Sequence, residues 1–314
     1  MTCHNCRTEC RKFWKTLKGQ QRYRCCKCFK TYSEPRNEHL GGMYTAPETV
    51  EQIVKLFVEG CSIRSIERLT GAHQVTILKV LELAGRRCGR LMEATIRNVP
   101  VKDVQCDEMW GFVYCKEKRN VTGDPERGDA YCFVGIERNS KLILTWHLGR
   151  RSALDTAIFI EKLNAATDGH FQIATDGFSP YVDAILTSLG TRVDFSQLIK
   201  VYAAPAENET RYSPARVVEV IAKPVWGQPD AARICTSHVE RQNLTMRMHI
   251  RRLTRLTNAF SKKRENLKWA LALHFGWYNF CRTHRTIRVT PVMEAGITAR
   301  IWTVGELLGA NPKP

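Results

Sequence analysis

The sequence predicts a multidomain protein of mixed α+β and α/β class. Two cysteine pairs open the 314-residue chain, helical periodicity follows over residues 44–97, and alternating strands and helices fill residues 101–290. The charge follows the same division: residues 1–100 carry 18 basic and 9 acidic side chains, residues 101–240 carry 16 and 19, and residues 241–290 carry 12 and 1. The formal net charge of +17 indicates an anionic polymer as partner.

The first predicted module covers residues 1–40 and is a small zinc ribbon. Cys3 and Cys6 form one Cys-x2-Cys pair, and Cys25 and Cys28 form a second pair eighteen residues later. Four thiolates at this spacing suit one tetrahedral structural Zn²⁺, and so short a module needs such a staple. The remaining cysteines nearby are expected to be bystanders. The pattern leaves open whether the ribbon binds DNA or serves only as a structural or protein-contact element.

Three helices are predicted in residues 44–97. The first begins near Pro47 and ends at Gly60, Ser62 caps the second, and a turn at Gly71 leads to the third. Two helices joined by a short glycine-containing turn are typical of a helix-turn-helix DNA-binding domain. An ordinary three-helix bundle without a ligand would show the same pattern. In the first reading, the candidates to face the major groove are His73, Gln74, Thr76 and Lys79.

The larger domain, residues 101–290, has the element order of an RNase H-like fold with a mixed sheet. Apolar alternation and turn residues predict strands at 104–114, 130–137 and 142–148, a helix at 152–163, a strand at 171–177, a helix at 181–189, a strand at 193–202 and a basic helix from Ser237 to Arg255. A proline-bearing stretch, 203–236, is expected to be irregular or a short hairpin insertion. Residues 291–314 are read as a closing tail.

Three acids occupy informative places in this order. Asp107 lies on the first strand, Asp176 ends the fourth, and Glu240 begins the basic helix. Carboxylates are the ligands that Mg²⁺ or Mn²⁺ prefers, and two such ions serve phosphodiester displacement. Each acid also has an ordinary interpretation. Asp107 could be a surface residue of an edge strand, with Glu108 as the rival candidate. Asp176 could be a turn former, and Glu240 could be a helix-start residue. All three arising by accident in this order is the weaker interpretation, so we expect a magnesium site.

A basic surface is predicted beside these acids. Asn243, Arg247 and Arg251 follow Glu240 at helical spacing and are expected to track phosphates. A second, aromatic-rich helix is predicted at 262–281, followed by a polar cluster. The further DNA-binding candidates are Arg252, Lys262, Lys263, Arg282 and Arg285.

These motifs resemble bacterial DDE transposases of the insertion-sequence-one type. The resemblance covers nearly the whole chain and rests on residues 107–113, 175–178, 239–247, 258–263, 278–286 and 21–25. It implies a transposase that binds the terminal inverted repeats of its element as double-stranded DNA, cleaves them and joins them to target DNA. It also implies a homo-oligomer on DNA. The stretch 203–236 is longer than the family's compact pattern.

Two alternatives keep the same elements. In one, the chain is a sequence-specific DNA-binding regulator with an inactive RNase H-like domain; in the other, it is a structure-specific nuclease. No apolar run approaches the roughly twenty residues of a membrane span. We therefore expect a cytoplasmic, nucleoid-associated protein without membrane contact.

Overall fold

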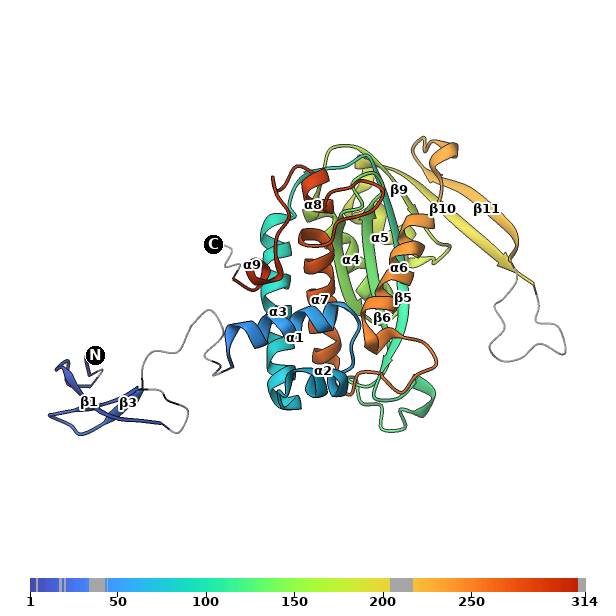
Figure 1. Ribbon diagram of the computed structural model, residues 1–314. Coiled ribbons are helices and arrows are strands. Elements are labelled where there is room, and N and C mark those ends of the chain that lie inside the picture. The colour runs from blue at the N-terminus through green and yellow to red at the C-terminus, as the bar shows by residue number, and fades with distance from the viewer. Residues whose placement is uncertain are drawn as a thin grey trace. The chain divides into compact units, whose positions relative to one another are not determined.

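The computed structural model describes residues 1–3, 5–16, 19, 21–33, 43, 45–203 and 217–309 (Figure 1). The chain forms two compact units, Met1–Val50 and Glu51–Pro314. The four-part division expected from the sequence stays a prediction. No helix in the described ranges has the length and apolar character needed to cross a membrane.

The first unit contains an antiparallel three-stranded sheet. Strands β1 (Cys10–Lys15), β2 (Gln21–Cys25) and β3 (Thr31–Ser33) follow one another in the sheet as they do in the chain. Cys10 pairs with Cys25 across β1 and β2, so the hairpin ends at the second cysteine pair. Helix α1 (Pro47–Val58) begins in this unit.

Two capped helices continue the chain. Ser62 accepts a 3.1 Å hydrogen bond from the Ser65 amide and so begins α2 (Ile63–Thr70), and Gly71 ends it with a left-handed φ of 68°. Helix α3 (Gln74–Thr95) begins after His73. This helix is 22 residues long and continues through the basic residues Arg86, Arg87 and Arg90.

The length of α3 follows from its packing against helix α7 (Arg264–Phe280). A Cβ at Gly85 would lie 2.7 Å from Trp269 atoms, and one at Gly276 would lie 2.7 Å from the Cβ of Cys88. Both contacts require glycine, since the helix backbones approach too closely for a larger residue. The second half of α3 is thereby fixed in the second unit, and its buried face carries Leu81, Ala84, Cys88 and Leu91.

A six-stranded mixed sheet forms the centre of the second unit. Its strand order is β11-β10-β9-β5-β6-β7. The long strands β5 (Asp103–Val113), β6 (Gly128–Glu137) and β7 (Ile143–Gly149) pair antiparallel. Strand β9 (Phe171–Thr175) pairs parallel with both β5 and β10 (Val193–Tyr202), and β11 (Val217–Trp226) pairs antiparallel with β10. This mixed arrangement is compatible with an RNase H-like domain.

Helices and short elements cover and connect this sheet. The remaining helices are α4 (Ala153–Ala166), α5 (Pro180–Ser188), α6 (Ser237–His249), α8 (Pro291–Glu294) and α9 (Val304–Gly309). The 3-10 turns are η2 (Glu117–Arg119), η3 (Gly190–Arg192), η4 (Ala231–Arg233) and η5 (Arg251–Leu253). A second, two-stranded pair joins β4 (Val99–Pro100) to β8 (Thr167–Asp168).

The structure corrects two predicted boundaries. The basic helix ends at His249 rather than Arg255, because Ile250 takes an extended conformation and η5 then buries Leu253. The aromatic-rich helix begins at Arg264 rather than Lys262. Within 203–236, which was expected to be irregular or a short hairpin insertion, residues 217–226 form β11, and its antiparallel pairing with β10 agrees with the hairpin alternative.

Candidate metal centres

Three carboxylates meet where β9 ends beside β5. Asp107 and Glu108 lie on β5, and Asp176 follows the last residue of β9. Their oxygen ligand atoms all lie within 4.8 Å of one another. In the described pairings, β9 joins β5 only along Asp103–Gln105, so the two acids of β5 lie just beyond the last pair.

Asp107 faces α6. One of its oxygens accepts a 2.7 Å hydrogen bond from the Asn243 amide, and the other accepts the Glu108 backbone N–H at 2.8 Å. Burial raises the pKa of the Asp107 carboxyl to about 7, and the neighbouring Asp176 and Glu108 add to the effect. The ionised form of Asp107 is therefore destabilised by burial and by its acidic neighbours, and a nearby cation would stabilise it.

Glu108 points to the opposite face of the sheet. It accepts hydrogen bonds from Arg151 Nε at 2.5 Å and from the Tyr181 hydroxyl at 3.2 Å. Burial, followed by the charge of Asp176, raises the pKa of Glu108 to about 7 and outweighs the opposing effect of Arg151. The Arg151 guanidinium also lies 3.6 Å from Asp176 and 4.2 Å from the Phe178 ring centroid.

Asp176 is held at the turn that leaves β9. Its side chain accepts the Phe178 backbone N–H at 3.0 Å, and burial raises its pKa. A Cβ at the next residue, Gly177, would lie 3.2 Å from Ile199, so the chain passes close to β10 as it turns.

Glu240 lies in the first turn of α6 but outside the 4.8 Å group of ligand atoms. It accepts a 2.6 Å hydrogen bond from the Thr236 hydroxyl and forms an ion pair with Lys200 of β10. The start of this helix is fixed to β5 by Gln105, whose side-chain oxygen accepts the backbone N–H groups of His238 and Val239 at 2.9 and 3.2 Å. Glu240 is thus carried by the element that also brings Asn243 to Asp107.

The donor set fits a hard divalent cation. Clustered carboxylate oxygens in a partly buried site are the ligands of Mg²⁺ and Mn²⁺. The side-chain oxygen of Asn243 is buried and has no hydrogen-bond partner among the described residues, while its amide nitrogen is bonded to Asp107. A neutral oxygen of this kind beside a carboxylate is a further suitable ligand, directly or through water.

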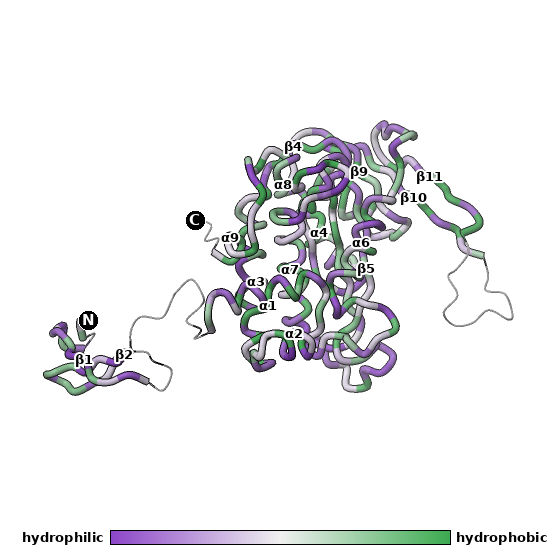
Figure 2. Tube along the Cα trace, in the orientation of Figure 1, coloured by the Kyte–Doolittle hydropathy of each residue, from purple (hydrophilic) through white to green (hydrophobic). Residues whose placement is uncertain are grey.

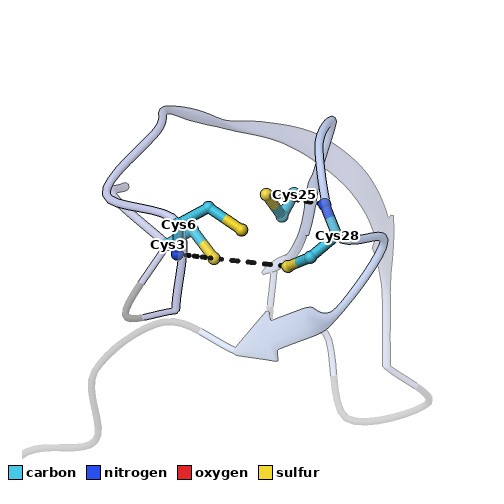
Figure 3. Close-up of side chains that lie close together, drawn as sticks. All are labelled: Cys3, Cys6, Cys25 and Cys28. Carbon is cyan, nitrogen blue, oxygen red and sulfur yellow. Dashed lines mark hydrogen bonds between the residues drawn. The ribbon is translucent and has the colours of Figure 1, made fainter.

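The four cysteines of the first unit form a separate cluster. The sulfurs of Cys3, Cys6, Cys25 and Cys28 lie within 4.8 Å of one another, and Figure 3 shows their side chains turned toward one another. A tetrahedral Zn²⁺ with bonds of about 2.3 Å needs sulfurs about 3.8 Å apart, and Cys3 lies 3.5 Å from Cys28. The cluster could therefore hold zinc.

Hydrogen bonds favour the thiolate form, which zinc binds, at two of these sulfurs. Cys25 accepts N–H groups from Lys27 and Cys28 at 3.3 and 3.4 Å, and the bond from Cys28 is the largest cause that lowers the pKa of the Cys25 thiol to about 6. A hydrogen bond with the Tyr32 hydroxyl lowers the pKa of Cys3. The opposing shift at Cys6, to about 12, comes from its hydrogen bond with Cys28.

The predicted helix-turn-helix candidates lie at the start of α3. His73, Gln74 and Lys79 are exposed and Thr76 is half-buried. His73 accepts the Val75 backbone N–H at 3.3 Å, and Gln74 donates to Glu67 of α2 at 2.7 Å. The structure describes these helices and their turn, and their DNA contacts stay a prediction.

The other basic residues predicted to bind DNA differ in their exposure to solvent. Arg251, Lys262, Lys263 and Arg285 are exposed. Arg247 is half-buried, and the Arg282 guanidinium lies 5.4 Å from the Trp277 ring centroid. Arg252 lines a small cavity with Leu273 and His274, and burial lowers its pKa to about 10. The expectation that Arg251 continues the helical face of Glu240 is wrong, since α6 ends before it.

Several residues of the carboxylate site have only a weak signal in the sequence. Glu108 was a candidate only as an alternative to Asp107, because strand alternation places the two side chains on opposite faces of the sheet. Arg151, Tyr181 and Lys200 had no motif at all. Gln105 was not predicted as a site residue. Its signal in the sequence is a polar amide inside an apolar strand, two residues before Asp107, and the structure buries this amide.

No family model matches this sequence, and no curated protein matches it. Among solved structures, the chain is similar to one described as a pre-cleavage Mos1 transpososome, with 10% sequence identity and a TM-score of 0.20. The match covers 53% of this chain and 61% of the other, so it spans less than two thirds of that neighbour.

Proposed function

We propose that this chain is a DDE transposase that binds the terminal inverted repeats of its element, cleaves their strands and joins them to target DNA. The observation that carries the proposal is the convergence of Asp107 and Asp176 beneath the first turns of α6, which bears Glu240 and Asn243. Carboxylates on two adjacent strands and a helix suit divalent cations that act on phosphodiesters.

Asp107 and Asp176 would hold the cations, with Glu240 as the third carboxylate. Mg²⁺ or Mn²⁺, when bound as a pair, would supply a polarised nucleophile and charge stabilisation at the phosphorus. The chain's own contribution is positional: Asn243 orients Asp107, Gln105 anchors α6, and Arg151 holds Glu108. Glu240 would exchange its contact with Lys200 for a metal or a metal-bound water.

The basic segments support the DNA-binding part of the proposal. The exposed start of α3 would contact the terminal repeats, and residues 241–290, with twelve basic side chains and one acid, would hold phosphates near the carboxylates. The cysteine cluster would hold one structural Zn²⁺. A homo-oligomer on DNA in the nucleoid belongs to the same proposal.

The decisive test uses the purified chain, duplexes carrying the inverted repeats that flank the gene, and a plasmid target in Mg²⁺ or Mn²⁺. We expect end cleavage and joining by the wild type, and retained end binding without joining by Asp107→Asn, Asp176→Asn and Glu240→Gln. Joining by any of these variants would refute the assigned triad. Binding without cleavage by the wild type would favour a regulator, and cleavage without joining or repeat preference a nuclease.

A further inference from the structure

Strand β11 presents an exposed apolar row at the edge of the central sheet. It is the terminal strand of the six, and nine of its ten residues are exposed. Val218 and Val220 are 57% and 53% exposed, and Trp226 is 44% exposed. In Figure 1, β10 and β11 extend past the other strands, and the apolar colouring of β11 is visible in Figure 2. An exposed apolar edge strand is a template for pairing with another chain.

Alternation separates the side chains of β11 into two rows. Between the register shifts near Val218 and Val225, pairing with β10 is regular, and Val220, Ala222 and Pro224 form a row on one face that is apolar throughout. The opposite row contains the only two charges of the strand, Glu219 and Lys223, placed symmetrically about Ile221. The strand is therefore close to palindromic in chemical character about Ile221.

This symmetry identifies the partner. When two copies of β11 pair antiparallel about a two-fold axis at Ile221, each Glu219 lies opposite the other copy's Lys223. The other opposed pairs within the regular part of the strand are Ile221 with itself and Val220 with Ala222, which are apolar. Each copy thus meets a chemically matched surface.

Other registers lack this match. Moving the axis by one residue, to Val220 or Ala222, places Glu219 opposite Ile221 or Val225 and leaves Lys223 opposite an apolar residue as well. Pro224 is compatible with an edge strand and sits near the end of the paired segment, where it removes at most one ladder hydrogen bond per copy. The two charges therefore select one register and disfavour the rest.

We infer that β11 is a self-association surface, which pairs with β11 of a second copy about Ile221 and joins two six-stranded sheets. This inference is independent of the transposase proposal, because it rests on the edge strand alone and needs no DNA or catalysis. It assigns a role to the segment in which the sequence predicted no chemistry.

The test measures the mass of the zinc-loaded full chain by sedimentation equilibrium without DNA. We expect a wild-type dimer, a dissociation constant raised about tenfold or more in Glu219→Lys and in Lys223→Glu, and recovery in the double charge reversal, because two cross-strand pairs change sign in each single variant. Glu51→Lys is the matched control, since Glu51 forms an exposed ion pair with Lys55 on α1. This control should dimerise as the wild type does.

A zero-length carbodiimide provides a second readout. Glu219 and Lys223 of one strand lie about 13 Å apart along the chain, which is too far for a direct link, so an amide between them must join two copies. We expect a covalent dimer whose cross-linked peptide contains both residues. A monomeric wild type, unchanged mass in both single reversals, or no recovery in the double reversal would overturn the inference.

Discussion

The Asn243 amide donates a 2.7 Å hydrogen bond to Asp107 and so joins α6 to β5 at the carboxylate cluster. Its carbonyl oxygen is buried and has no partner in the described part of the chain. The position of Asp107 therefore depends on a residue that itself carries no charge.

Asn243→Ala should weaken metal binding at the carboxylate cluster by about tenfold to a hundredfold, because outer ligands of this kind orient the first ones. Isothermal titration with Mn²⁺ checks this without any activity. Leu244→Ala, at the exposed adjacent position on α6, is the matched control and should bind Mn²⁺ as the wild type does. Equal Mn²⁺ affinity in Asn243→Ala and the wild type would remove the positioning role from Asn243.

Gln105→Met should destabilise the second unit by about 1–3 kcal/mol. The substitution keeps the volume but leaves two backbone N–H groups at the start of α6 without their acceptor. Urea unfolding measures the loss, with Gln228→Met as the control, since Gln228 is exposed. A loss no greater than in that control would show that α6 does not depend on this cap.

The carboxylate cluster should make the protein less stable as pH rises from about 4 to about 7 in the absence of divalent cations. The pKa of Asp107 is raised to about 7 in the folded chain and is about 3.9 when unfolded, so the folded state binds more protons across this range. Relative to Asp107→Asn, the wild type should lose about 2–3 kcal/mol between pH 5 and pH 7.5.

Urea unfolding of the wild type and Asp107→Asn at both pH values tests this, because contributions from groups that do not interact with Asp107 cancel in the difference. Mn²⁺ should restore the wild type more at pH 7.5 than at pH 5, since it binds the ionised form. A wild type that gains stability over the variant as pH rises would contradict the raised pKa.

Cys25→Ser should reduce bound zinc from about one ion per chain to well below one and unfold the first unit. The adjacent Cys26 is exposed and outside the cluster, so Cys26→Ser should keep the full zinc content. Elemental analysis after exhaustive dialysis measures the metal, and proteolysis of residues 1–50 measures the unfolding. Equal zinc in the two variants would exclude the four-cysteine site.

The order of the main elements was predictable because each has a regular apolar period and clear turn residues. Strand β10 matched its predicted limits, and Asp107 and Asp176 lie together as the strand order predicted. The end of α6 at His249 was not predictable, because neither glycine nor proline marks it; burial of Leu253 in the following turn decides it.

Tertiary position explains the other differences. The prolines of 203–236 left an irregular segment and a hairpin insertion as alternatives, and Pro224 lies in β11 because an edge strand tolerates proline. Glu108 joins the cluster from the opposite face of β5 because β9 ends beside it, just beyond the last β5–β9 pair. The residue at which the pairing of two strands ends cannot be predicted from the sequence of either strand alone. Lys200 reaches Glu240 through the pairing of β10 with β9, which likewise depends on the assembled sheet.

Arg151 gives the carboxylate cluster a counter-ion that belongs to the chain, since its guanidinium contacts Glu108 and lies near Asp176. Three acids this close would otherwise oppose folding. The order of assembly at the two centres should therefore differ. With zinc as its ligand, the cysteine module should fold only when the ion is bound. The carboxylate cluster should form first and bind its cation afterwards, so it should lose and regain that cation without unfolding.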